Sequence, residues 1–126
     1  MILIDTTVLI DALRNRNQRR GLLEAWVLRG EQLATSAMNV AEIYSGCRPR
    51  EEVMTRALLA GLVRYAITPE IAERAGLMKA ALMRAGQTCS IADMMVAATA
   101  LEHGMEVATD NVKDFQLPGL KLIQLP

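Results

Sequence analysis

Short apolar runs alternate along the chain with segments of helical character. The runs predict strands at residues 1–4, 32–36, 64–67, 105–109 and 120–125. The segments between them predict helices that cover residues 8–13, 20–29, 40–44, 50–62, 69–85 and 90–103. Strands separated by helices favour an α/β fold with a mostly parallel central sheet that is covered by helices on both faces.

Local signals support several of these boundaries. Residues 1–4 form an unbroken apolar run, which is expected of a strand that is buried on both faces. Thr68 and Pro69 predict a helix start, with threonine as the cap and proline in the first turn. Gly86 and Gly104 predict helix ends. No linker or repeat interrupts residues 1–126, so we expect a single domain.

Composition narrows the class of protein. The chain has 126 residues, of which 52% are hydrophobic and 22% charged, as in a folded globular domain. Cys47, Cys89 and the single His103 are too few for a disulfide scaffold or a zinc site, and free thiols suit a reducing compartment. Charges interrupt every apolar stretch before it reaches membrane-spanning length. These features predict a soluble, cytoplasmic protein.

Charge is balanced overall but uneven along the chain. The formal net charge is zero, so no overall field indicates a nucleic-acid binder. Residues 12–30 nevertheless contain a cluster of arginines with Glu24 as the one acid: Arg14, Arg16, Arg19, Arg20 and Arg29. This cluster could hold phosphates, or it could be the solvated face of a helix and loop.

Acidic residues follow or precede the predicted strands in four separate segments. Asp5 follows the first strand, and Glu42 lies near the start of the helix after the second. Asp93 lies in the first turn of the helix that leads into strand 105–109. Three further polar residues follow that strand: Asp110, Asn111 and Asp114. Because binding groups of such sheets collect beyond the carboxyl ends of the strands, these segments can deliver carboxylates to one edge.

Clustered carboxylates repel one another, and a hard divalent cation removes that conflict. Mg²⁺ or Mn²⁺ prefers oxygen ligands and keeps open positions for water and phosphate oxygens. Such a cation can lower the pKa of a bound water and stabilise the charge of a phosphodiester transition state. The acidic set therefore favours metal-dependent hydrolysis of phosphodiesters.

Each acid also has a purely structural interpretation. Ser90 and Asp93 have the spacing of a capping box. Glu42 could face solvent from an amphipathic helix or complete a cap with Asn39, and Asp5 could belong to an Asx-turn. The pair Asp110–Asn111 could form a turn, and Asp114 could start another. Placement of all the acids at one edge of the sheet is not required by capping.

Four segments in order resemble the PIN-domain ribonucleases of the bacterial VapC toxin type. ILIDTTVLI at residues 2–10 resembles the opening motif of the family, and VAEIYSG at 40–46 its second acidic motif. IADMMVAATA at 91–100 resembles the third. TDNVKDF at 109–115, followed by PGL at 118–120, resembles the closing segment.

This resemblance implies a three-layer α/β/α PIN-like fold, a magnesium-dependent endoribonuclease and an inhibitory antitoxin partner. It implies Asp5 and Asp93 as metal ligands, Glu42 as the residue that orients the metal-bound water or a second ion, and Thr6 as a contact to the metal shell or phosphate. The fourth acidic role falls to Asp114, with Asp110 as the weaker candidate. Asn111 could bind a water or phosphate.

The implied reaction is attack of a metal-activated water on phosphorus, which leaves 5′-phosphate and 3′-hydroxyl ends. The arginines at positions 14, 16, 19 and 20 would hold the RNA backbone. Aromatic residues are too rare for base stacking to dominate, which favours a structured RNA read by shape.

The resemblance also implies a homodimer or a toxin–antitoxin hetero-oligomer. We expect an apolar groove for the antitoxin, with residues 9–28 and Tyr44 as candidate lining, although these could equally be core. The helix at residues 71–82 could contribute to dimerisation. One alternative is a catalytically weak PIN-fold module that acts through antitoxin binding. Another is a phosphatase with Asp5 as nucleophile, which Thr7 disfavours because a second acid is usual at that position.

Overall fold

Five parallel strands form the central sheet of the computed structural model, which describes residues 1–126. They are β1 (Ile2–Ile4), β2 (Leu33–Ser36), β3 (Val63–Tyr65), β4 (Glu106–Ala108) and β5 (Leu122–Ile123). Their order in the sheet is β3-β2-β1-β4-β5, and every pairing is parallel. The predicted α/β class is confirmed, with a sheet that is wholly rather than mostly parallel.

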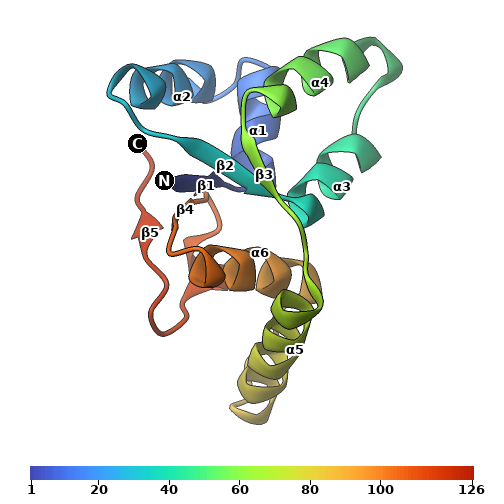
Figure 1. Ribbon diagram of the computed structural model, residues 1–126, viewed down its shortest axis with the longest axis vertical. Coiled ribbons are helices and arrows are strands. Elements are labelled where there is room, and N and C mark those ends of the chain that lie inside the picture. The colour runs from blue at the N-terminus through green and yellow to red at the C-terminus, as the bar shows by residue number, and fades with distance from the viewer.

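Helices cover both faces of this sheet and complete three α/β/α layers. The α-helices are α1 (Thr6–Leu13), α2 (Arg19–Leu28), α3 (Ala37–Ser45), α4 (Glu52–Ala60), α5 (Pro69–Arg84) and α6 (Ile91–Glu102). Two 3₁₀ helices are η1 (Pro49–Glu51) and η2 (Val112–Phe115). Figure 1 shows α1, α2 and α4 on one side of the sheet, α6 on the other, and α5 projecting beyond α6.

The side chains of β1 explain why its sequence is apolar throughout. Ile2 and Ile4 point into the cluster that α1, α2 and α4 complete. Leu3 points to the opposite face, where it packs with side chains of α6. All three residues are at most 4% exposed. Because side chains alternate between the two faces of a sheet, a strand that is covered on both faces is apolar at every position.

The order of the strands reverses direction at β1. From β1 the chain moves outward to β2 and β3, and it then returns to place β4 on the other side of β1. In parallel sheets the crevice for a ligand opens at such a point, beyond the carboxyl ends of the strands. Asp5 follows β1 directly and therefore lies at this position.

Several boundaries differ from those predicted. The third strand begins at Val63, where pairing with β2 begins, and the fifth is limited to the two residues that pair with β4. The helix predicted at residues 50–62 begins as η1 and continues as α4. Both cysteines are free thiols, and none of the helices has the length and hydropathy needed to cross a membrane.

Candidate active site

Asp5 lies at the centre of the polar residues beyond the strands. It caps α1, is 5% exposed, and accepts a hydrogen bond at Oδ1 from the Thr6 backbone N–H (2.9 Å). Oδ1 also accepts from Asn39 Nδ2 (3.2 Å), and Oδ2 accepts from the Thr109 hydroxyl (2.8 Å). Because a carboxylate has about four acceptor positions, one position on Oδ2 remains free.

Glu42 approaches this centre from α3. The Thr6 hydroxyl donates to Glu42 Oε1 at 3.0 Å, which joins α3 to the first residue of α1. Burial raises the pKa of Glu42 above its ordinary value; the Thr6 hydrogen bond opposes this rise, and the negative charges of Asp5 and Asp93 add to it. Three carboxylates from three elements therefore lie within electrostatic range of one another.

Asp93 enters from the first turn of α6. Its backbone N–H donates to Ser90 Oγ at 3.0 Å, so Ser90 caps the helix. The reciprocal bond of a capping box, from the Ser90 N–H to the Asp93 carboxylate, is not formed. Burial raises the pKa of Asp93; the Ser90 hydroxyl opposes this rise, and the charges of Asp5 and Asp114 add to it. The Asp93 carboxylate thus lies within electrostatic range of two other acids and does not complete the capping box.

One helix cap predicted from the sequence is wrong, and two residues that contact Asp5 were not predicted. Asn39 is not the cap of α3; Ser36 is, and Asn39 forms a full capping box with it. Asn39 and Thr109, which both hold Asp5, were not predicted as site residues. The Ser36-x-x-Asn39 spacing could have identified the cap, but nothing local indicates that Asn39 reaches back to β1.

The two candidate acids in the segment after β4, Asp110 and Asp114, have different surroundings. Asp110 Oδ1 forms a 2.8 Å ion pair with Arg19, which occupies that carboxylate. Asp114, in η2, is the one that contributes to the pKa of Asp93. Asn111 is exposed, and its backbone N–H donates to the Thr109 hydroxyl at 3.0 Å. Of the two acids, Asp114 is therefore the one within electrostatic range of Asp93, while Asp110 is paired with Arg19.

Three of the four candidate RNA-binding arginines have partners within the protein. Arg14 binds Glu51 and the Gly46 carbonyl. Arg19 is 6% exposed, because it binds Asp110 and the Pro126 carbonyl.

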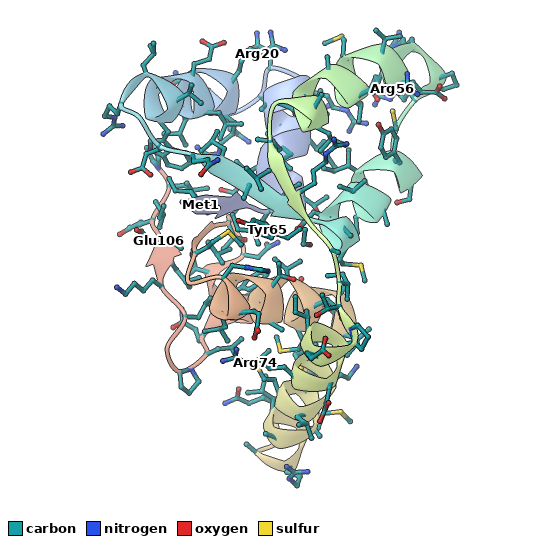
Figure 2. All side chains as sticks on the ribbon, viewed as in Figure 1. Met1, Arg20, Arg56, Tyr65, Arg74 and Glu106 are labelled. Atoms are coloured by element: carbon teal, nitrogen blue, oxygen red, sulfur yellow. The ribbon has the colours of Figure 1, made fainter.

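Arg20, which Figure 2 labels near the start of α2, donates to the carbonyls of Ala12 and Leu13 at the end of α1. Arg16 is exposed, and its side chain makes no hydrogen bond. The four candidate RNA-binding arginines are therefore largely structural, and Arg16 is the one of the four with an uncommitted side chain.

The donor set fits a hard divalent cation. No three acidic, histidine or cysteine side chains lie close enough to enclose a metal by themselves. Mg²⁺ does not need such a cage, since one or two carboxylates with several waters usually hold it. Asp5 and Asp93 can provide these carboxylates, and an all-oxygen set suits Mg²⁺ or Mn²⁺ rather than Zn²⁺.

The raised pKa values predict a pH-dependent stability for the metal-free protein. The ordinary pKa of Glu42 is 4.5 and its folded-state pKa is higher, so the folded protein binds the proton more tightly than the unfolded chain. Its favourable contribution is complete below about pH 4 and is lost as pH rises through the folded-state pKa. We therefore expect Glu42→Gln to raise Tm by a few degrees at about pH 7 in the presence of EDTA.

The comparison with wild type should be made across the range from about pH 4 to pH 8. The gain in Tm should vanish at the acidic end, where both proteins are neutral at this position. Arg14 lowers the pKa of Glu51 to about 2, so Glu51 stabilises the fold at higher pH, opposite to Glu42. This contribution is the same in wild type and Glu42→Gln, and it cancels in the difference between their Tm values. A gain in Tm that stays constant across this range would contradict the assignment.

Comparisons with known proteins agree with this architecture. The family model of the PIN domain matches residues 2–116. The chain is 34% identical to the ribonuclease VapC10 of Mycobacterium tuberculosis over 93% of its own length and 87% of that protein. It is 29% identical to the ribonuclease VapC19 of the same organism, over 93% and 94% of the two chains.

A solved structure supports the same relationship. One chain of a toxin–antitoxin complex from Klebsiella pneumoniae superposes with a TM-score of 0.80 at 30% identity. The match covers 98% of this chain and 97% of that one. The likeness therefore extends over the whole domain, including every segment that contributes a carboxylate.

Proposed function

Because the chain belongs to the PIN domain family, we propose that it is an endoribonuclease toxin that requires a divalent metal and is inhibited by an antitoxin protein. Its relatives include proteins named as ribonucleases of the VapC type. The observation that carries the catalytic part of the proposal is the convergence of Asp5, Glu42 and Asp93 beyond the strands, where burial raises the pKa of Glu42 and of Asp93 and the charge of Asp5 adds to both rises.

In this proposal, Asp5 and Asp93 hold the metal, which is Mg²⁺ or Mn²⁺. When bound, the cation supplies a Lewis acid that lowers the pKa of water and offsets phosphate charge. Three hydrogen bonds hold Asp5 in place, so that only the free position on Oδ2 is available to the metal. Asp114 completes the acidic set from η2.

Glu42 orients the attacking water. Burial raises the pKa of Glu42, which favours uptake of a proton, and the hydrogen bond from Thr6 holds Oε1 in place. The helices α1, α3 and α6 all begin at this edge, so the partial positive charge of their N-termini favours a bound phosphate. Attack of water on phosphorus with departure of the 3′ oxygen leaves 5′-phosphate and 3′-hydroxyl ends. Arg16 and Asn111 have uncommitted side chains that can contact the RNA backbone.

The antitoxin is proposed to bind an apolar groove between α2 and α4. This groove has a volume of about 560 Å³ and is lined by Leu23, Glu24, Val27, Leu28, Leu33, Ala57, Leu58, Gly61 and Leu62. A second depression shares four of these residues and extends the groove to the end of α1. An apolar helix or extended segment is the partner that such a groove suits.

The lining predicted from the sequence overlaps this groove in part. Leu23, Val27 and Leu28 line it, whereas Leu9 is fully buried core and Tyr44 lies on α3 outside it. A homodimer is proposed to use α5, where Leu77 and Met83 are 64% and 60% exposed.

The test of the proposed activity is sequencing of RNA ends after brief expression in bacteria. We expect discrete new 5′-phosphate ends with the wild-type chain and none with Asp93→Ala. The same ends would identify the RNA target. Absence of new ends with the wild-type chain, together with intact antitoxin binding, would instead support a binding module without catalysis, and the same new ends with both proteins would contradict the role of Asp93.

A further inference from the structure

Asn39 is a buried polar residue whose hydrogen-bonding capacity is fully used. It lies in the first turn of α3 and is 0% exposed. Its Oδ1 accepts from the Ser36 backbone N–H (3.1 Å) and from the Ser36 hydroxyl (2.6 Å). Its Nδ2 donates to Asp5 Oδ1 (3.2 Å) and to Thr6 Oγ1 (3.0 Å). One amide thus connects the cap of α3 to the residues that follow β1.

The orientation of this amide is determined by its partners. The Ser36 backbone N–H can only donate, so the oxygen of the Asn39 amide must face it. The reversed amide would place N–H against N–H at Ser36 and oxygen against the Asp5 carboxylate. Both hydrogens of Nδ2 are therefore directed toward Asp5 and Thr6.

This orientation also sets the direction of the next hydrogen bond. The Thr6 hydroxyl accepts from Asn39, and its own single hydrogen is then available for Glu42 Oε1 at 3.0 Å. This series of hydrogen bonds runs from the amide of Asn39 through the hydroxyl of Thr6 to the carboxylate of Glu42. A second branch runs from the same amide directly to Asp5.

We propose that Asn39 is a positioning residue of the active site, which holds the Asp5 carboxylate and directs the Thr6 hydroxyl toward Glu42. The proposal rests on the proposed function, because it assigns Asn39 a role toward carboxylates that bind a metal and orient water. Residues that hold metal ligands through hydrogen bonds usually affect metal affinity or activity about 10–100-fold when replaced.

Capping alone does not account for these contacts. The capping box uses Ser36 Oγ with the Asn39 backbone N–H, and Asn39 Oδ1 with the Ser36 backbone N–H. Neither hydrogen of Nδ2 belongs to it. An aspartate at position 39 could form the same box, yet it would place an acceptor where Asp5 and Thr6 now receive donors. Asn39→Asp therefore separates the two roles.

The kinetic test compares Asn39→Asp with wild type on an oligonucleotide that carries the cleavage site found by end sequencing. We expect kcat to fall about 10–100-fold, with KM changed much less, because the contacts to RNA remain. Thr35→Val is the matched control, since it removes a buried hydroxyl that donates to the Ile4 carbonyl and touches none of the acids. A folded Asn39→Asp protein with wild-type kcat would overturn the proposal.

A second readout does not depend on activity. Titration with Mn²⁺ should give a Kd about 10-fold weaker for Asn39→Ala than for wild type, and an unchanged Kd for Thr35→Val. Equal Mn²⁺ affinity in Asn39→Ala would contradict the positioning role even if the wild type cleaves no RNA. A wild type that cleaves no RNA but binds Mn²⁺ would refute the proposed function alone. A wild type that binds no Mn²⁺ would refute both the proposed function and the positioning role of Asn39.

Discussion

Replacing Asp93 with asparagine is expected to lower the rate of RNA cleavage at least about 100-fold, which corresponds to about 2.7 kcal/mol of transition-state stabilisation. Burial raises the pKa of the Asp93 carboxyl, and the negative charges of Asp5 and Asp114, which lie within electrostatic range, add to this rise. Asparagine has nearly the same shape but gives up the charge that a divalent cation requires. The measurement is kcat with the cleavage-site oligonucleotide at saturating Mg²⁺.

The fold should survive this change. The cap of α6 uses the backbone N–H of residue 93 and the hydroxyl of Ser90, both of which remain. Removal of the charge should even raise Tm in EDTA at neutral pH, because the ionised carboxylate is disfavoured in the folded state. Gains in stability on removal of functional charges are a common result at active sites.

Ser90→Ala is the matched variant for the alternative that Asp93 serves only the helix cap. It removes the cap, at a cost of about 1 kcal/mol in the free energy of unfolding, and leaves the carboxylate in place. We expect this variant to keep most of its cleavage activity. If Asp93→Asn were as active as wild type and less stable, Asp93 would be a capping residue and the proposed metal site would be wrong.

The fold could be predicted from the sequence because its signals are local and agree with one another. Buried parallel strands are apolar throughout, as residues 1–4 show, and caps such as Thr68 have a recognisable spacing. The ends of strands were less predictable, since they depend on a partner. Residues 120–125 were predicted as one strand, but only Leu122 and Ile123 find partners in β4.

The acids could be predicted as a group for a geometric reason. The carboxyl ends of parallel strands meet at one edge, so Asp5 and the residues after β4 had to lie near each other. The preference for Asp114 over Asp110 came from the family resemblance alone, because the ion pair that occupies Asp110 involves Arg19, which is 91 residues away in the sequence. Their catalytic roles remain predictions.

The arginines show a limit of counting charges. A cluster in the sequence indicates only that positive charge is concentrated, and the same guanidinium can bind a phosphate, a carboxylate or a carbonyl. In the structure Arg20 binds carbonyls at the end of α1, and Arg14 binds Glu51. Asn39 was missed for a similar reason, since its contacts to Asp5 span 34 residues.

Introducing a charge into the groove between α2 and α4 is expected to abolish antitoxin protection without loss of RNA cleavage. Ala57 is exposed in the free chain and lines both parts of the groove, so Ala57→Glu should leave the fold intact. A bound apolar segment would bury the new carboxylate without a partner, which we expect to weaken binding at least about 100-fold. The measurement is antitoxin affinity by calorimetry, with growth on co-expression as the cellular readout.

Ala60→Glu is the matched control for this prediction, because the same substitution is made on the same helix at an exposed residue that lines neither part of the groove. Cells that produce Ala57→Glu with the antitoxin should stop growing, whereas cells that produce Ala60→Glu should grow. The proposed active site is at the carboxyl ends of the strands and does not include either alanine, so both variants should cleave RNA like the wild type. If the two variants bind the antitoxin equally well, the partner uses another surface and the groove has a different role.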